Sequence, residues 1–344
     1  MIKVVIENKI PFIRGVLDDY CQVSYLAPED FTADIVKDVD AMIIRTRTRC
    51  NASLLEGSRC KLIATATIGT DHIDLDYCSQ KGIAVYNAPG CNAPAVAQYV
   101  FASIAYWLKE KGDLRPINTL TIGIVGVGHV GSIVERWARQ LGMNVLCCDP
   151  PKAEVENTNN FVSLETIAEH ADIITFHTPL TKSGKYPTYH MCDATFLDKV
   201  AQCPLIIDSA RGPIVDTSAI IDALDNHKIS DVVIDCWENE PNISNELLKR
   251  AIVATPHIAG YSREGKIRAT AMSVKALTKH FGLPDISLSE TVPAGAAEHV
   301  SFETIENSYS PKEDTIALKE DKYSFEQLRN TYNYRSEVKN IILE

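Results

Sequence analysis

The sequence has fewer basic than acidic residues, and this deficit limits its partners. Its 344 residues include 34 Lys and Arg against 45 Asp and Glu, for a formal net charge of −11. Binding of nucleic acid or anionic lipid without sequence specificity needs a broad basic face. We therefore expect neither nucleic acid nor a membrane as a partner, and an anionic ligand must be held by a local pocket.

Long apolar runs and closely paired cysteines are also missing. The longest apolar stretch, 96–108, is interrupted by Gln98 and is too short to span a bilayer. The first residues lack the basic-then-apolar layout of a signal peptide, so a cytoplasmic location is expected. The ten cysteines include no C-x-x-C pair. That pattern favours reduced core thiols and predicts no metal site.

What the sequence does contain is an alternation of short apolar runs with segments of helical spacing. Apolar runs without polar alternation are typical of parallel strands covered on both faces. Six runs fall between residues 120 and 255, the number in one complete dinucleotide-binding sheet. The predicted fold class is α/β, with two doubly wound parallel sheets. The predicted strands are 4–6, 41–44, 62–66, 84–86, 121–125, 144–147, 172–176, 205–208, 232–235 and 252–254.

Two changes in pattern divide the chain. A long apolar helix opening near Asn92, a plausible N-cap, separates the two sheets. After residue 286 the apolar runs no longer resemble parallel strands. Ser310 and Ser324, each followed three residues later by Glu or Gln, predict two helices that begin with capping boxes. We expect this tail to form a small appended unit with an apolar stripe that a partner chain could cover.

A glycine-rich turn indicates a cofactor site. Gly126, Gly128 and Gly131 directly follow the strand predicted at 121–125 and open a helix whose first residues are His129 and Val130. Such glycines allow a tight turn, the approach of a pyrophosphate and close packing of helix on strand. The helix N-terminus adds free amides and the positive end of its dipole. The turn therefore predicts a dinucleotide site.

The next strand ends at Asp149. Its distance along the chain from the glycine turn is close to the ~20 residues at which an acid accepts hydrogen bonds from the ribose hydroxyls of NAD. Pro150 and Pro151 follow it instead of an Arg, so a 2′-phosphate would meet repulsion without a counter-charge. NAD is therefore favoured over NADP as the cofactor. The alternative role for Asp149 is to cap a turn.

Three charged side chains follow strands of the same predicted sheet: Arg211, Glu240 and His257. Ligands bind at the carboxyl ends of parallel strands. A guanidinium can hold a carboxylate through paired hydrogen bonds, an imidazole can accept the proton of a hydroxyl, and a carboxylate can orient that imidazole. Together they suit hydride transfer from a 2-hydroxy acid.

Taken alone, each of these residues has a simpler interpretation. Arg211 would be a surface residue of a turn, Glu240 an acid at the start of a helix, and His257 a histidine satisfied within a loop. Two other histidines compete for the role of the base. His177 is expected to line the nicotinamide pocket or to pack, and His72 to cap a helix start.

The sequence resembles the D-isomer-specific 2-hydroxyacid dehydrogenases over roughly residues 1–285. The matching phrases are A-T-A-T-I-G-T-D-H-I-D at 64–74, N-A-P-G-C-N-A at 87–93, G-I-V-G-V-G-H-V-G at 123–131, C-D-P-P at 148–151, F-H-T-P-L at 176–180 and H-I-A-G-Y-S at 257–262. The resemblance implies NAD-dependent oxidation of 4-phospho-D-erythronate to (R)-3-hydroxy-2-oxo-4-phosphooxybutanoate, a step toward pyridoxal 5′-phosphate (vitamin B6). Alternatives are another 2-hydroxy acid such as 3-phosphoglycerate, or a non-catalytic NAD(H)-sensing protein of this fold.

The same resemblance implies residue roles and domains. His257 would be the acid/base beside Arg211 and Glu240. The residues expected to contact NAD are Asp149, Thr178, Asp235 and Gly260, and those expected to contact the substrate are Thr46, Thr67 and Tyr261. The implied domains are a substrate-binding domain of residues 1–93 and 265–286, an NAD-binding domain of 94–264 and a small α+β dimerisation domain of 287–344, and hence a homodimer.

The implied substrate carries about three negative charges. Arg45, Arg47 and Arg49 follow a predicted strand, where alternation would place them on one face and Thr46 on the other. We hypothesise that Arg45 or Arg47 helps to hold the phosphate, and the alternative is a solvated basic edge. Gln98 departs from the family, which usually has Glu at that position.

Overall fold

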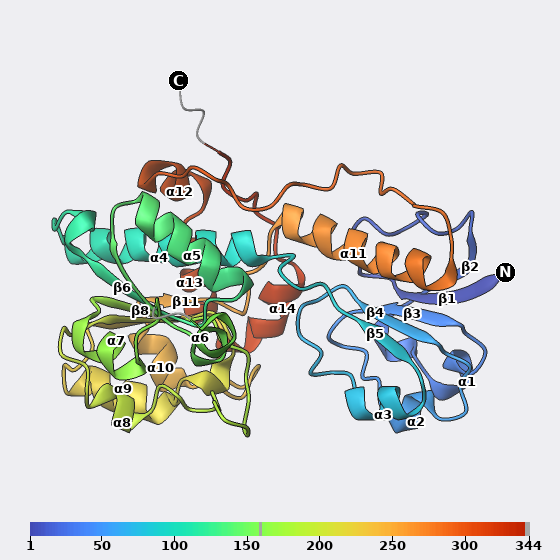
Figure 1. Ribbon diagram of the computed structural model, residues 1–344, viewed down its shortest axis with the longest axis horizontal. Helices are drawn as coiled ribbons and strands as arrows, with labels where there is room; N and C mark the ends of the chain where they lie inside the picture. The colour runs from blue at the N-terminus through green and yellow to red at the C-terminus, as the bar shows by residue number, and fades with distance from the viewer. Residues whose placement is uncertain (158–159, 341–344) are drawn as a thin grey trace. The chain divides into compact units, whose positions relative to one another are not determined.

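The computed structural model describes residues 1–157 and 160–340 and divides into two compact units. The first unit consists of Met1–Asn92 and Ser262–Gly295, and the second of Ala93–Tyr261 and Ala296–Glu344. Figure 1 shows that each unit is built around its own sheet. In the described part of the chain, no helix combines the length and apolar character needed to cross a membrane.

The first unit contains a five-stranded parallel sheet with the order β2-β1-β3-β4-β5. Alternate residues of its strands face two separate cores: Val4 and Ile6 pack with α11, whereas Val5 packs toward the shorter helices. Both faces are covered, which explains apolar runs without alternation. The elements are β1 (Ile2–Glu7), β2 (Cys21–Leu26), α1 (Ala33–Val36), β3 (Ala41–Ile44), α2 (Ala52–Leu55), β4 (Leu62–Thr65), α3 (Leu75–Gln80), β5 (Ala84–Tyr86), α11 (Arg263–Phe281) and the short turn η1 (Pro28–Asp30).

The second unit contains a six-stranded parallel sheet with the order β11-β10-β9-β8-β6-β7. From β6 the chain pairs first with β7 on one side and then returns to β8 on the other. This reversal makes the carboxyl end of β6 the switch point where ligands bind in such sheets. The strands are β6 (Thr121–Val125), β7 (Asn144–Cys148), β8 (Ile173–Phe176), β9 (Leu205–Asp208), β10 (Asp231–Ile234) and β11 (Val253–Ala254).

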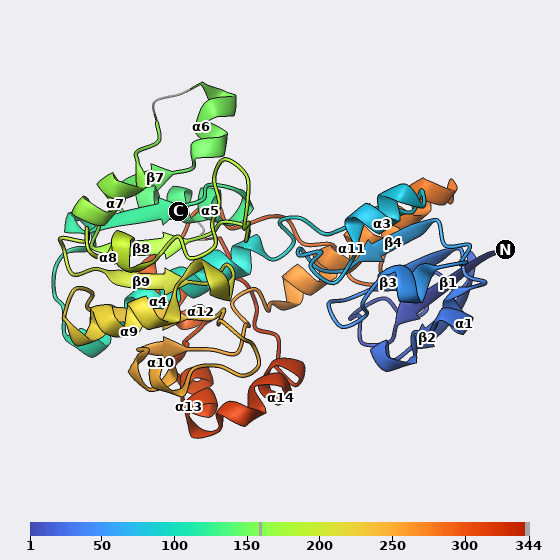
Figure 2. The ribbon, with the colours of Figure 1, turned by 90° about the horizontal axis from the view of Figure 1, so that it is seen from below.

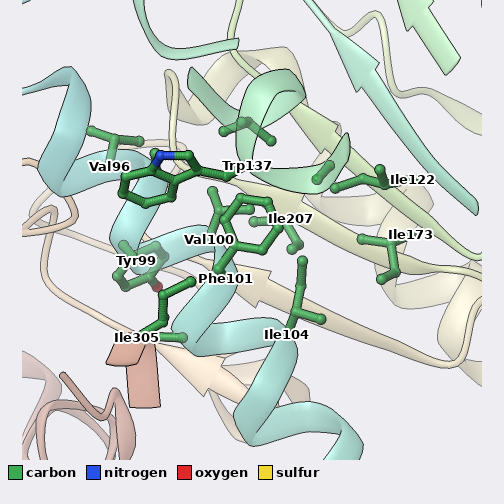
Figure 3. Close-up of a cluster of buried hydrophobic side chains, with 14 of the residues drawn as sticks. Val96, Tyr99, Val100, Phe101, Ile104, Ile122, Trp137, Ile173, Ile207 and Ile305 are labelled. Carbon is green, nitrogen blue, oxygen red and sulfur yellow. The ribbon is translucent and has the colours of Figure 1, made fainter. Parts of the chain in front are cut away.

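Helices cover both faces of this sheet. One core joins α4 and α5 to the strands through Phe101, Trp137 and Ile207 (Figure 3), and the other lies beneath α7 to α10. The helices of the main body are α4 (Ala93–Lys111), α5 (His129–Gln140), α6 (Pro150–Glu156), α7 (Leu164–His170), α8 (Ala194–Leu197), α9 (Thr217–Asp225) and α10 (Asn245–Arg250), with turns η2 (Ile117–Thr119) and η3 (Gly212–Ile214).

The tail packs onto the second unit instead of standing apart. It contains α12 (Phe302–Ser308), α13 (Lys312–Glu320), η4 (Lys322–Ser324) and α14 (Phe325–Asn330). Ile305 of α12 joins the core of α4, and Leu318 and Phe325 join the opposite core, with α13 at the β11 edge (Figure 2). A separate α+β unit was expected, but these side chains are buried in the existing cores, and the described tail residues 296–340 form helices and no named strand.

The ten predicted strands are all present with ends within two residues, and the structure adds β2. Helices begin near Ser310 and Ser324 as predicted, but the predicted capping boxes were wrong, since Pro311 and Ser324 cap without a side-chain hydrogen bond. The tail's capping box joins Ser301 and Thr304. All ten cysteines are free thiols, and Cys203 alone is exposed.

Candidate active site

The glycine turn lies at the switch point of the second unit's sheet. Gly126 has a φ of +89°, and a Cβ there would lie 2.9 Å from the backbone carbon of His177. A Cβ on Gly131 would lie 1.9 Å from the carbonyl oxygen of Gly126. By contrast, a Cβ on Gly128 would have no protein atom within 4 Å. The turn is therefore closed on the protein side and open at Gly128, the side from which a pyrophosphate would approach.

Helix α5 begins at this turn, with Gly128 as its N-cap. The first i→i−4 bond is the one from the Ser132 N–H to Gly128 O, so the amides of His129, Val130 and Gly131 precede the helical ladder. They point their N–H groups toward the helix N-terminus, where the dipole favours negative charge. These residues fit the phosphates of a dinucleotide.

Asp149 lies beside the same turn and caps a helix as well. Its Oδ2 accepts the Val127 N–H at 2.8 Å, and its Oδ1 accepts the Lys152 N–H at the start of α6 at 3.0 Å. Each carboxylate oxygen keeps a further lone pair, so capping and binding of ribose hydroxyls are compatible. No sequence pattern marks Lys152, whose Nζ donates to Val127 O at 3.1 Å.

The residues after β8 complete the turn's surroundings. The Thr178 Cγ2 atom would lie 2.9 Å from a Cβ on Gly126, so Thr178 packs on the glycine turn. Burial lowers the pKa of His177 to about 3, and its Nε2 lies 3.1 Å from Thr175 Oγ1. A ring that is neutral and weakly basic suits packing, as expected, better than proton abstraction.

His257 and Glu240 form a hydrogen-bonded pair at the ends of β11 and β10. The Nδ1 atom of His257 lies 2.9 Å from Glu240 Oε2 and 3.1 Å from Oε1, and Oε1 also accepts the Trp237 N–H at 2.8 Å. Burial alone would raise the pKa of Glu240, but the charge and hydrogen bond of His257 and the Trp237 N–H together lower it. An ionised carboxylate can only accept, so Nδ1–H is the donor in this bond, and in the neutral imidazole Nε2 is then left as the acceptor.

The backbone of His257 is held in an unusual conformation. Its φ is 58°, in the left-handed region that non-glycine residues rarely adopt. The His257 N–H donates to Asp235 O and Thr255 O. The buried Asp235 carboxylate accepts the N–H groups of Ile258 and Ala259 at 2.7 and 2.9 Å and the Thr255 hydroxyl at 2.6 Å. Asp235, expected to contact NAD, thus supports the loop that presents His257 and carries Gly260.

Arg211 follows β9, next to the loop that carries Glu240. A Cβ on Gly212 would lie 2.0 Å from the backbone carbon of Trp237, so only glycine lets the two loops approach this closely. The Nη1 group of Arg211 donates to Ala210 O at 2.7 Å. Burial raises the pKa of the Cys236 thiol well above its usual value. The positive charge of Arg211 is close enough to lower the same pKa by a smaller amount. The structure therefore brings Arg211, Glu240 and His257 to neighbouring loops at one edge of the sheet.

Among the residues that the structure describes, one group could hold a metal ion: Cys236, Glu240 and His257, with ligand atoms within 4.8 Å of one another. Burial raises the pKa of the Cys236 thiol well above its usual value, so the thiol is the protonated form when no metal is bound. Burial also raises the pKa of Asp208, a buried acid at the end of β9 that the sequence analysis did not consider.

The residues expected to bind the substrate in the first unit lie after β3 and β4. Because β3 ends at Ile44, residues 45–49 form a turn, and the expected strand alternation of the arginines was wrong. The buried Glu7 accepts the Arg45 N–H at 2.9 Å, and Arg45 Nη1 donates to Lys9 O at 3.1 Å. Thr46 and Arg47 are exposed in this turn.

Thr67 follows the adjacent strand β4, and its hydroxyl lies 2.6 Å from Thr65 Oγ1 and 3.2 Å from Gly69 O. The ring of His72 lies 3.2 Å from Thr65 Oγ1, and its pKa is lowered by burial. The expected capping role of His72 was wrong, because Asp74 caps α3.

Tyr261 lies in the second unit, where tail residues surround it. Its hydroxyl accepts a hydrogen bond from Arg329 Nε at 3.2 Å, and its ring packs edge-on against Tyr332 and Tyr334. Sequence reasoning missed Arg329 because no local pattern in the tail marks a partner so distant along the chain.

Comparison with known proteins identifies relatives of this chain. Residues 95–259 match the family model of the D-isomer specific 2-hydroxyacid dehydrogenase NAD binding domain. The chain is 47% identical over 342 residues to the erythronate-4-phosphate dehydrogenase of Bacteroides thetaiotaomicron, covering 98% of this chain and 97% of the relative. It is 38% identical to the erythronate-4-phosphate dehydrogenase of Porphyromonas gingivalis, covering 98% and 94%.

Among solved structures, the chain is similar to the D-lactate dehydrogenase of Aquifex aeolicus in complex with NAD and lactic acid. The TM-score is 0.67 at 27% identity, with 81% of this chain and 95% of that chain covered. The chain thus belongs to the erythronate-4-phosphate dehydrogenase family of D-isomer specific 2-hydroxyacid dehydrogenases.

Proposed function

We propose that the chain oxidises C2 of 4-phospho-D-erythronate with NAD, giving (R)-3-hydroxy-2-oxo-4-phosphooxybutanoate in pyridoxal 5′-phosphate synthesis. The observation that carries this proposal is the bond from His257 Nδ1 to Glu240, which leaves Nε2 as a proton acceptor. The choice of substrate is supported by the 47% identity to a relative of that name across nearly the whole chain.

In the proposed reaction, the carboxylate of the substrate binds the guanidinium of Arg211. His257 Nε2 takes the proton of the C2 hydroxyl, and Glu240 stabilises the imidazolium that results. When bound, NAD would supply the acceptor for the hydride of C2, so that a hydroxy acid would become a keto acid with release of one proton. Reduced cofactor and keto acid are formed in equal amounts.

The cofactor is proposed to bind along the glycine turn. Gly128 leaves room for the pyrophosphate, and the amides of the first turn of α5 face it. The carboxylate of Asp149 would accept hydrogen bonds from the ribose hydroxyls. The remaining residues proposed to contact NAD are Thr178, Asp235 and Gly260.

The phosphate and the rest of the substrate are assigned to the turn residues of the first unit and to Tyr261. We place Thr46, Thr67 and Tyr261 at the substrate and Arg45 or Arg47 at its phosphate. This assignment is supported by the position of the turn at the carboxyl ends of β3 and β4. The first unit is thereby the proposed substrate-binding domain.

We further propose a cytoplasmic homodimer formed through the C-terminal segment. The buried side chains of the tail pack within the second unit. Two other apolar side chains of the tail are exposed to solvent, Ile316 by 46% and Tyr323 by 87%. Contiguous exposed apolar patches are typical of contacts with a partner chain, and we propose that these two side chains belong to such a patch. Light scattering should give twice the chain's mass, and Tyr323→Lys should lower it toward that of one chain.

A substrate panel tests the proposed function. NADH formation is measured with 4-phospho-D-erythronate, unphosphorylated D-erythronate and 3-phosphoglycerate. The kcat/KM should be highest for 4-phospho-D-erythronate, and the product should react as a 2-keto acid. Cofactor binding without turnover of any of the three would favour a sensor and would refute the proposal.

A further inference from the structure

The loop that follows His257 is hydrogen-bonded to the guanidinium of Arg335, a residue near the C-terminal end of the chain. Arg335 Nη1 donates to Ile258 O at 3.1 Å and to Tyr261 O at 3.2 Å, and Nη2 donates to Ala259 O. Three carbonyls of the segment 258–261 therefore share one cation. Hydrogen bonds from a charged donor are about twice as strong as neutral ones.

We propose that Arg335 is a positioning residue that holds the His257 loop in its catalytic conformation. This makes the C-terminal tail part of the proton-transfer machinery. The inference rests on the proposed function, because it acts through His257 as the acid/base.

Two side chains bind the backbone of the loop, one through its N–H groups and the other through its carbonyls. The carboxylate of Asp235 accepts the N–H groups of Ile258 and Ala259, whereas Arg335 binds the carbonyls of the same two residues. The loop begins at His257, whose φ of 58° is costly for a residue with a side chain. Such a conformation persists only where its surroundings over-determine it. Arg335 supplies the hydrogen bonds to the carbonyl side of that loop.

Arg335 is itself fixed to the core helix α4. Its Nε donates to Gln98 Oε1 at 3.1 Å, and its Nη2 donates to Ala95 O at 3.1 Å. The guanidinium also lies over the ring of Tyr309, 4.3 Å from its centroid. The loop is thereby tied to the longest helix of the second unit.

Gln98 of α4 forms hydrogen bonds that hold the tail against the second unit. It is fully buried in an otherwise apolar stretch of α4, where an amide needs partners. Its Nε2 donates to Ser308 Oγ at 2.8 Å and to Ser336 O at 3.0 Å, while its Oε1 accepts from Arg335. A glutamate could not donate to Ser336 O. Gln98 is thus matched to this tail by its amide, which both donates to it and accepts from it.

The test compares two tail cations. Arg335→Ala removes the donor to the loop, and Lys319→Ala is the matched control, since Lys319 Nζ donates to Ala251 O outside the loop. Arg335→Lys keeps the charge but cannot reach three carbonyls with one ammonium. The kcat, the KM for NAD and the thermal unfolding of each variant are measured with 4-phospho-D-erythronate, with and without ethylguanidinium.

We expect Arg335→Ala to lower kcat about 10- to 100-fold, the cost of displacing a catalytic group by about 1 Å. The KM for NAD should change less than about threefold, Arg335→Lys should restore only part of kcat, and ethylguanidinium should raise kcat for Arg335→Ala alone. Where Arg335→Ala does not fold, Arg335→Lys is judged by the same drop in kcat.

A folded Arg335 variant with kcat within about twofold of the wild type would overturn the proposal. So would a loss that Lys319→Ala reproduces and ethylguanidinium leaves unchanged, because the tail would then act only through stability. Failure of the proposed function would look different, since the wild-type protein itself would not oxidise the substrate.

Discussion

The Nδ1 atom of His257 lies 2.9 Å from Glu240 Oε2, although the two residues lie in loops that follow different strands and His257 has a left-handed backbone. The left-handed backbone and the hydrogen bond to Glu240 thus occur at the same residue. Asp235 and Arg335 bind the backbone of the loop that follows it.

Glu240→Gln should keep the hydrogen bond to His257 and lose the charge. The pKa of Glu240 is lowered in the folded protein from its ordinary 4.5, so the ionised pair stabilises the fold above that value. This stability is lost as the pH falls through the lowered folded pKa. The difference in free energy of unfolding between wild type and Glu240→Gln should therefore shrink as the pH falls below about 4.5. Urea titrations across this range measure it, and a difference independent of pH would contradict the pairing.

Gly128→Ala and Gly131→Ala form a matched pair in one turn. A Cβ on Gly131 would lie 1.9 Å from Gly126 O, so Gly131→Ala should lower the melting temperature clearly. A Cβ on Gly128 meets no protein atom within 4 Å, so Gly128→Ala should melt near the wild-type temperature but bind NADH more weakly. Calorimetry of both variants measures the two effects. Normal NADH affinity in Gly128→Ala would remove this glycine from the cofactor site.

Arg211→Lys should reduce kcat/KM strongly, because an ammonium cannot reproduce the two-pronged hydrogen bonds of a guanidinium to a carboxylate. NADH titration serves as the control and should give a nearly unchanged affinity. Wild-type turnover in Arg211→Lys would show that no such paired bond is made.

Replacing Arg45 and Arg47 together by Ala should raise the KM for 4-phospho-D-erythronate far more than the KM for unphosphorylated D-erythronate. The reason is that a phosphate carries about two charges that these side chains would neutralise. Steady-state kinetics with both acids decide the matter. Equal changes for the two acids would assign the arginines to a solvated edge.

Much of the fold could be predicted because its signals are local. Strands buried on both faces appear as unbroken apolar runs, and Gly126 to Gly131 lie next to one in the sequence. Strand β2 was missed because it pairs on one edge only and several of its residues are half-buried or exposed, which weakens the apolar signal.

The tail shows where sequence reasoning fails. Arg335 binds carbonyls of residues 258–261, and carbonyls are present in every residue, so no side-chain pattern announces the contact. The one available signal was Gln98, a polar residue in an apolar helix that required polar partners. Glu240 and His257 were predictable as a pair because both follow strands that end at one edge.

The most direct test of the account is the kcat of His257→Ala with 4-phospho-D-erythronate, measured beside NADH binding. The account predicts a fall of about two to four orders of magnitude, the usual contribution of a general acid/base, with NADH affinity preserved. An undiminished kcat in His257→Ala would show that another group moves the proton, and the central claim would then be wrong.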